Sequence, residues 1–131
     1  MPELFTIQQA RELIPWLQKS FDAMQPAIDQ LDHIRQDFLG KSNHIRSNGG
    51  GKAAEEMTQA KEILDHAQKG IDQMVASIVD QGVLIKSIET GLFDFPSMMD
   101  GNLIYLCWLA GEPELMYWHT PDSGFAGRQS L

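Results

Sequence analysis

Two runs of apolar residues at helical spacing constrain the fold of this chain more than any other feature. The first run advances in steps of three or four residues and comprises Leu13, Leu17, Phe21, Met24, Ile28, Leu31, Ile34 and Phe38. The second run alternates steps of three and four and comprises Met57, Ala60, Leu64, Ala67, Ile71, Met74 and Ile78. Such spacing gives each helix one apolar stripe, and the second stripe is a heptad seam typical of a coiled coil. The two runs therefore predict an antiparallel hairpin of long helices.

The first run contains two prolines inside its helical pattern. Thr6 precedes the run and is a good N-cap, so the helix is expected to begin at about residue 7. Pro15 and Pro26 each remove a backbone donor and clash with the carbonyl group four residues back. We therefore expect a short first helix around 7–14, a kink or restart at Pro15 and another kink near Pro26. Because the apolar spacing survives both prolines, one bent rod is favoured over separate helices.

Residues 40–51 form the main break between the two runs and are rich in Gly, Ser and Asn. This composition predicts a flexible link, after which the second helix is expected over about 52–80. A Gly-rich phosphate-binding loop is the alternative interpretation. The segment does not end in Gly-Lys-Ser or Gly-Lys-Thr, however, and no apolar strand precedes it.

After Gly82 the apolar period changes from helical to alternating. Alternation indicates β-strands, and the candidate strands are residues 83–88, 103–108 and 115–119. A turn at 110–113 joins the last two strands, and residues 89–100 are expected to form a longer connection. The strands are apolar on both faces, so one face can cover the helices, and the other needs the tail or another subunit.

These patterns together predict a single α+β domain over residues 1–131. A long, kinked, antiparallel helical hairpin is expected at about 7–80. It packs with a three-stranded antiparallel sheet at about 83–119, and an ordered tail occupies 120–131.

Composition excludes several classes of function. The formal net charge is -8, which argues against nucleic acid and against anionic membrane surfaces, because both require Lys and Arg. The chain has one Cys, so an intramolecular disulfide and a zinc site with two or four Cys ligands are excluded. The N-terminal residues do not resemble a signal peptide, and no apolar stretch is long enough to span a bilayer. We expect a cytoplasmic protein.

His119 is the strongest single candidate for chemistry. Its imidazole suits acid–base work or a metal ion, and carboxylates for such a site are available at Asp94, Asp100, Glu112 and Asp122. The candidate metal ligands are His119, Glu112 and Asp122. A lone His near a strand end is more often a hydrogen-bonded structural residue, and no ligand pair here has a diagnostic spacing.

Cys107 is a candidate nucleophile with His119 as its base. Side chains alternate along strands, so the register decides whether the two meet. If Tyr105 lies opposite His119, both side chains point to one face; if Ile104 does, they point to opposite faces. A Cys within an apolar strand is more often buried and structural.

Arg128 and a group of aromatic residues complete the candidates. The Arg128 guanidinium suits an anion clamp or a salt bridge that pins the tail to Asp94, Asp100 or Glu112. Trp108, Tyr117 and Trp118 suit either a ligand box or core packing. The candidate catalytic residues are His119, Arg128, Asp94 and Cys107. The candidate ligand-binding residues are Asp94, Asp100, Trp108, Glu112, Trp118, His119 and Arg128.

Several motifs of the final third occur together in one known family. They are Asp94-Phe95-Pro96, Asp100-Gly101, Tyr105-Leu106-Cys107-Trp108, Gly111-Glu112, Trp118-His119 and Gly124-Phe125-Ala126-Gly127-Arg128. With an early Phe-Thr and a Ser-Asn-Gly-Gly link, the chain resembles the prokaryotic family known as domain of unknown function 2203 over nearly its whole length. The resemblance implies no assigned activity and marks the tail as the shared feature. That family often has an Arg before the Asp-Gly, where this chain has Met99.

The sequence therefore favours a homo-oligomeric protein that binds a partner or small ligand through its C-terminal third, with the apolar helix seam or sheet face as the subunit contact. The alternative is a small hydrolytic enzyme, metal-dependent or not, that uses His119, a nearby carboxylate and Arg128. The sequence leaves any cofactor unassigned.

Overall fold

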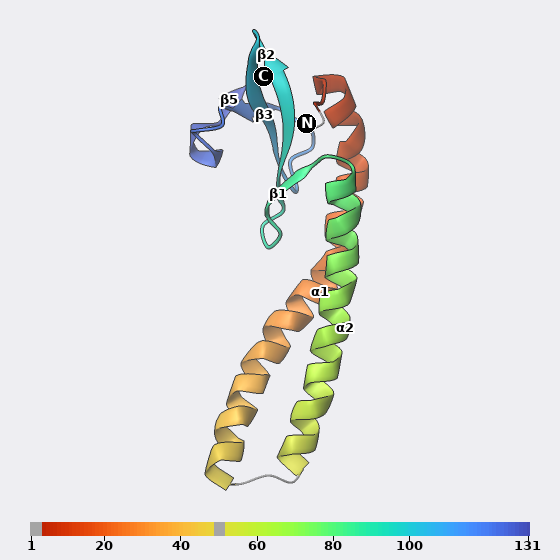
Figure 1. The fold of residues 1–131 in the computed structure, drawn as a ribbon, viewed down its shortest axis with the longest axis vertical. Helices are drawn as coiled ribbons and strands as arrows, with labels where there is room; N and C mark the ends of the chain where they lie inside the picture. Colours follow the sequence, from red (N-terminus) through yellow and green to blue (C-terminus); the bar gives the residue numbers. More distant parts are fainter. Residues whose placement is uncertain (1–3, 49–51) are drawn as a thin grey trace. The chain divides into compact units, whose positions relative to one another are not determined.

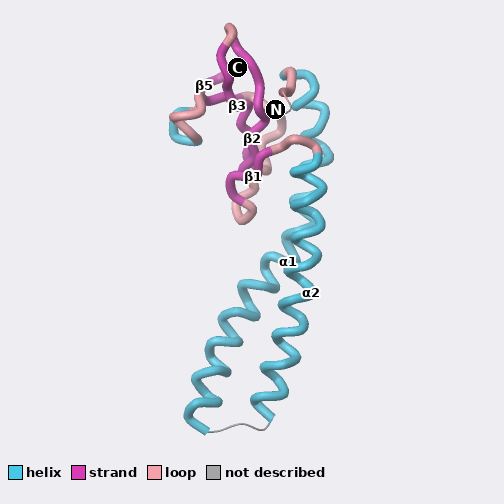
Figure 2. The backbone as a smooth tube through the Cα atoms, viewed as in Figure 1, coloured by secondary structure: helices cyan, strands magenta, loops and turns pink. Residues whose placement is uncertain are grey.

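The computed structural model describes residues 4–48 and 52–131 and confirms the α+β class (Figures 1 and 2). The helices are α1 (Ile7–Asn48), α2 (Lys52–Asp80) and a short 3-10 helix, η1 (Phe125–Gly127). The strands are β1 (Leu84–Ser87), β2 (Leu92–Met99), β3 (Asn102–Leu109), β4 (Tyr117–His119) and β5 (Gln129–Ser130). These elements form two compact units, residues 24–74 and residues 1–23 with 75–131.

Helix α1 is one continuous helix, and it is longer than the sequence predicts. It begins with a capping box: the Thr6 hydroxyl accepts a hydrogen bond from the backbone N–H of Gln9, whose side-chain oxygen accepts one from the N–H of Thr6. The helix passes Pro15 and Pro26 without a restart. It also continues through Gly40 to Asn48, so the expected break over 40–51 is wrong for residues 40–48. Residues 49–51 of that segment lie outside the described residues.

The unit formed by residues 24–74 contains the later part of α1 and most of α2, which run antiparallel (Figure 1). Both apolar stripes are buried: Met24, Ile28 and Leu31 on α1, and Ala60, Ala67 and Ile71 on α2. Helix α2 has the bounds that its heptad seam predicts. The Ala positions leave room for close approach of a neighbouring helix, which explains the buried seam.

The other unit contains a five-stranded antiparallel sheet in the order β1-β2-β3-β4-β5. The sequence predicts three strands and places a connection where β2 lies, so that prediction needs correction. Pro96 and the charged Asp94 obscure the strand pattern of β2. The two-residue turn Asp100-Gly101 joins β2 to β3, and both residues have positive φ, 51° and 81°, as the hairpin turn of type I′ requires. Strand β5 comes from the tail and pairs with β4.

The two faces of the sheet have different surroundings. One face packs on the segment before α1, where Phe5 meets Phe95, and on the N-terminal half of α1, where Phe21 meets Phe93, both in edge-to-face contacts. Trp108 stacks on Phe93 on the same face and is fully buried. Directly paired residues share a face, and alternate residues point to opposite faces. The polar residues between these aromatics therefore project from the other face of the sheet.

Candidate functional site

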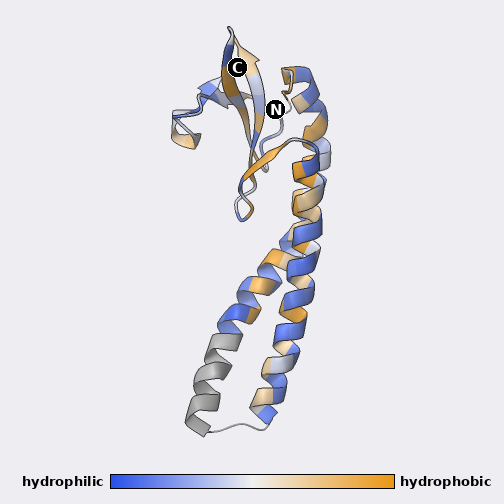
Figure 3. Cartoon of the chain, viewed as in Figure 1, coloured by the Kyte–Doolittle hydropathy of each residue, from blue (hydrophilic) through white to orange (hydrophobic). Residues whose placement is uncertain are grey.

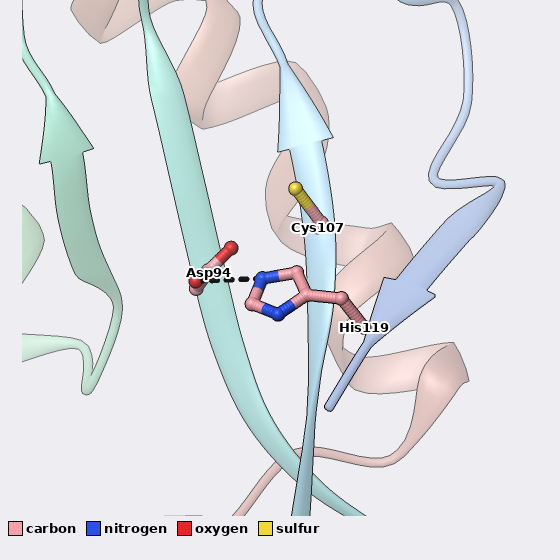
Figure 4. Close-up of side chains that lie close together, drawn as sticks. All are labelled: Asp94, Cys107 and His119. Carbon is pink, nitrogen blue, oxygen red and sulfur yellow. Dashed lines mark hydrogen bonds and ion pairs between the residues drawn. The ribbon is translucent and has the colours of Figure 1, made fainter. Parts of the chain in front are cut away.

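Asp94, Cys107 and His119 meet on the sheet face that points away from α1 (Figure 4). Asp94 of β2 pairs directly with Cys107 of β3, and Tyr105 of β3 pairs directly with His119 of β4. Tyr105 opposite His119 is the register that the sequence analysis required for Cys107 and His119 to share a face. One candidate ligand atom from each side chain lies within 4.8 Å of the other two, and all three residues are buried. We call these three residues the Asp–Cys–His group.

Both ring nitrogens of His119 face oxygen acceptors. Nδ1 lies 2.8 Å from the backbone oxygen of Thr120, and it must carry a proton because a carbonyl oxygen only accepts. Nε2 lies 3.0 Å from Oδ2 of Asp94, and this contact needs a second proton, shared between the two atoms. The side chains are only 4% and 1% exposed, so the Asp94–His119 pair is a buried polar contact. Neither nitrogen is free to accept a further proton.

The Cys107 thiol is the third member of the group and is fully buried. Burial, and next the charge of Asp94, raises the pKa of Cys107 from 9.0 to about 12. Arg128 has an opposing, smaller effect on this pKa. The side chain is therefore a neutral thiol at physiological pH. The arrangement does not supply the thiolate and free imidazole nitrogen that the nucleophile hypothesis needs.

A cavity of about 250 Å³ opens beside the Asp94–His119 pair. It is lined by Lys86, Leu92, Asp94, Tyr105, His119, Pro121, Gly124 and Phe125. Strands β1 to β4 supply one wall, and residues 121–125 of the tail supply the other. Gly124 has φ 60° and ψ -159°, a backbone conformation that is essentially restricted to Gly. The tail of this chain is thus shaped to form part of the cavity wall.

Lys86 brings a positive charge to this cavity because of an irregularity in β1. Ile85 pairs with Phe93 and Ser87 pairs with Leu92, so Lys86 is the extra residue of a β-bulge. A bulge re-aims the side chain at the irregular position. The Lys86 ammonium lies 5.9 Å from the centre of the Tyr105 ring, within the range of a cation–π contact.

Arg128 and Glu112 form a separate contact that pins the tail. Nη2 of Arg128 lies 2.6 Å from Oε1 of Glu112 and 3.3 Å from the backbone oxygen of Cys107. The guanidinium carbon lies 4.0 Å from the ring centre of Tyr117 and 4.8 Å from that of Phe125. Glu112 also accepts a hydrogen bond from the backbone N–H of Leu109. This is the salt bridge expected if Arg128 fastens the tail, with Glu112 as the partner.

The remaining candidates lie apart from the Asp–Cys–His group. Asp122 is exposed, and Asp100 occupies the β2–β3 turn, so neither belongs to this group. Trp108 and Trp118 lie on the α1-facing side of the sheet, whereas Tyr117 lies on the other side. The aromatic ligand box is therefore split between faces. Of the proposed metal ligands, only His119 is in the group, and Glu112 binds Arg128 instead.

Sequence reasoning did not single out Lys86, Tyr105 or Thr120. Two signals were available in the chain. Lys86 is the only cation besides Arg128 in the final third. Tyr105 lies two residues before Cys107 on the same strand, so both side chains point to the same face of the sheet. The Thr120 carbonyl left no signal, because a backbone group is not readable from residue type.

The fold and the site define an α+β protein in which two long helices precede an antiparallel sheet. A buried Asp–Cys–His group lies beside a small cavity that the tail helps to line. The chain belongs to the family described as uncharacterized conserved protein DUF2203, whose model matches residues 3–131. No curated protein and no solved structure gave a significant match. In the described parts of the chain, no helix is both long and apolar enough to cross a membrane.

Proposed function

We propose that this protein binds a small anionic ligand in the cavity beside Asp94 and His119. The observation that carries the proposal is the cavity itself, which joins a buried polar pair to an ammonium group. Its volume of about 250 Å³ lies below the roughly 300–1,000 Å³ of sites for drug-sized ligands. The ligand is therefore a molecule of few heavy atoms.

The charges at the cavity support an anion. Asp94 and His119 share a proton and form a pair without net charge, so Lys86 supplies the unbalanced charge of the wall. An ammonium group is a strong hydrogen-bond donor to carboxylate or phosphate oxygens. Tyr105 and Phe125 supply aromatic surface for a short apolar part of the ligand.

Titration of the protein with formate, acetate and inorganic phosphate, followed by amide and side-chain NMR signals, tests this proposal. The signals of Tyr105, His119 and Gly124 should shift together and saturate. Lys86→Met keeps most of the side-chain stem and removes the charge, so it should weaken binding at least about threefold. Lys69→Met is the matched control, because Lys69 is exposed on α2 and does not line the cavity. Unchanged signals with every anion, or equal binding in both variants, would overturn the proposal.

A hydrolytic enzyme is the second candidate, favoured by the position of the Asp94–His119 pair in a cavity wall. His119 would have to release Asp94 or exchange the shared proton before Nε2 could act as a base. Hydrolysis of ester and phosphoester probes, abolished in His119→Asn with the fold intact, would favour this function. Equal rates in the two proteins would remove it.

We also propose that the protein is a homo-oligomer joined through its sheet. The tail covers only part of the face that carries Asp94. On the same face Leu84, Met98 and Leu103 are exposed, and the hydropathy colouring shows the first part of β1 in the orange of hydrophobic residues (Figure 3). Apolar side chains gathered on one sheet face favour burial against a second copy.

A further inference from the structure

We propose that Asp94, Cys107 and His119 bind a zinc ion, and that the cavity beside them gives access to an open fourth coordination position. This inference deepens the proposed function and rests on it in one respect: the same cavity admits the small ligand. Three protein ligands with one open position are the usual arrangement for zinc sites that bind an exchangeable ligand. The donors would be the Cys107 sulfur, Nε2 of His119 and a carboxylate oxygen of Asp94.

The spacing of the three donors fits a metal of this size after a small adjustment. The donor atoms lie within 4.8 Å of one another, and the Asp94–His119 contact is 3.0 Å. Zinc–ligand bonds of about 2.0–2.3 Å at tetrahedral angles place donors about 3.3–3.6 Å apart. Side-chain rotations that move the donor atoms by about 1 Å therefore give the required spacing. The paired strands β2, β3 and β4 hold the backbone at the three residues in place (Figure 4).

The hydrogen bonds of His119 orient its ring for a metal. Nδ1 donates to the backbone oxygen of Thr120, so Nε2 is the nitrogen directed at Asp94 and into the group. A metal-binding His usually donates its other N–H to a carbonyl or carboxylate in this way. The Thr120 carbonyl thus already supplies the outer contact of the site.

A second, independent observation points to a ligand at this position. Asp94 is only 1% exposed, and no hydrogen bond of ordinary geometry reaches its Oδ1. The Cys107 thiol interacts with the Asp94 carboxylate, but a thiol is a weak donor and does not replace a full hydrogen bond to this oxygen. Burying an unpaired carboxylate oxygen is costly. A cation within the Asp–Cys–His group would satisfy this oxygen.

Charge and donor type select zinc. A thiolate, a carboxylate and a neutral imidazole together balance the two charges of the ion, so the buried group stays neutral when the ion replaces the thiol proton and the shared proton. Sulfur and nitrogen donors favour zinc over magnesium and calcium, which require oxygen. Lys86 on the cavity wall would then pair with an anion that completes the coordination.

Cobalt substitution tests the site directly. Untagged protein is stripped with a chelator and titrated with Zn²⁺, and in parallel with Co²⁺ as a spectroscopic probe. We expect about one ion per chain and a thiolate-to-cobalt charge-transfer band in the near ultraviolet. Cys107 is the only Cys of the chain, so this band reports on one residue and needs no variant.

Variants of similar size test the ligand set. We expect Zn²⁺ affinity to fall at least about 100-fold in each of three variants, Asp94→Asn, Cys107→Ser and His119→Asn. Changing a residue that only hydrogen-bonds to a metal ligand lowers metal affinity by up to about 100-fold, and the loss of a ligand itself should cost no less. His66→Asn is the matched control, because His66 is exposed on α2. Circular dichroism checks that each variant folds. Binding without the charge-transfer band, or equal binding in the control and all three variants, would overturn the inference.

The two proposals can fail separately. Anion titration of the chelator-treated protein measures the cavity without metal. If anions bind there and Zn²⁺ does not bind, the zinc site is wrong and the proposed ligand-binding function stands. If Zn²⁺ binds with the cobalt signature and no anion shifts the cavity signals in either form, the zinc site stands and the proposed function is wrong.

Discussion

At the scale of single residues, Arg128 shows how one side chain can fix a tail. Its guanidinium donates to Glu112 and to the backbone oxygen of Cys107 while its flat faces contact two aromatic rings. Lys has no planar group and could not make both kinds of contact at once. Arg128 holds the segment before it in place, and that segment includes Gly124 and Phe125 of the cavity wall. Of the two roles that the sequence allows for Arg128, the observed contacts are those of the salt bridge that pins the tail, so Arg128 supports the cavity without lining it.

Cys107 gives a prediction about pH for the metal-free protein. Its pKa is raised from 9.0 to about 12 in the folded state by burial and by Asp94, so the folded protein binds more protons than the unfolded chain between these values. The associated stability is complete below pH 9 and is lost as the pH rises towards 12. We expect the free energy of unfolding to fall across this window by up to about 1.4 kcal/mol per pH unit from this group.

Urea unfolding of wild type and Cys107→Ser between pH 8 and 11 measures the effect. The difference between the two proteins isolates Cys107 from the Lys and Tyr residues that titrate in the same range. A thiol reagent at pH 8 should also react slowly with the native protein and rapidly in denaturant. Parallel pH profiles for the two proteins, or rapid native labelling, would contradict the assignment.

The candidate residues show what residue type alone can predict. His119 stands out in the sequence because an imidazole suits chemistry, and Asp94 and Cys107 were among the candidates. Their meeting depends on a strand, β2, that the sequence did not reveal. The sequence offers Asp94, Asp100, Glu112 and Asp122 as carboxylates for His119 and does not choose among them, whereas the sheet register brings Asp94 beside it.

At the scale of elements, Gly91 in the β1–β2 connection lies close to both α1 and the residue that follows β3. It has φ 78°, and a Cβ at this position would lie 2.6 Å from Cβ of Ala110 and 2.9 Å from the Phe21 ring. Gly91→Ala adds backbone strain to overpacking, so we expect it to lower the free energy of unfolding by about 2–5 kcal/mol. Denaturant unfolding at neutral pH measures this loss.

Gly111→Ala is the matched control for that substitution. Gly111 also has positive φ, 99°, but a Cβ there would meet no heavy atom within 4 Å. Gly111→Ala therefore adds backbone strain without overpacking, and we expect it to lower the free energy of unfolding by about 1–3 kcal/mol. Equal losses in the two variants would show that the close approach at Gly91 contributes nothing.

The bounds predicted for an element match the structure where its apolar residues keep one spacing without interruption. Helix α2 has an unbroken heptad seam, and its predicted bounds match the structure. In α1 the stripe stays in phase across Pro15 and Pro26, so packing outweighs the single hydrogen bond that each proline removes. Strand β2 was missed because its alternate positions hold Asp94 and Pro96. Asp100-Gly101 was the available signal for a hairpin at that point.

At the scale of the whole molecule, the uncovered part of the sheet face yields the last prediction. The tail closes the face over His119, and Leu84, Met98 and Leu103 stay exposed on the rest of it. Light scattering over a wide concentration range should give a mass that is a multiple of the 14.7 kDa chain. Leu103→Glu places a charge within the proposed contact and should shift the protein to monomer, because burying an unpaired carboxylate is strongly unfavourable.

Ile63→Glu separates this contact from one made through the exposed surface of α2. Ile63 is also an exposed apolar residue, but it lies on α2 in the other compact unit. If the sheet face joins the subunits, Ile63→Glu keeps the oligomer that Leu103→Glu dissociates. The opposite pattern would assign the contact to the helices. A compact wild-type monomer at high concentration would refute both, and the exposed sheet residues would then need no partner.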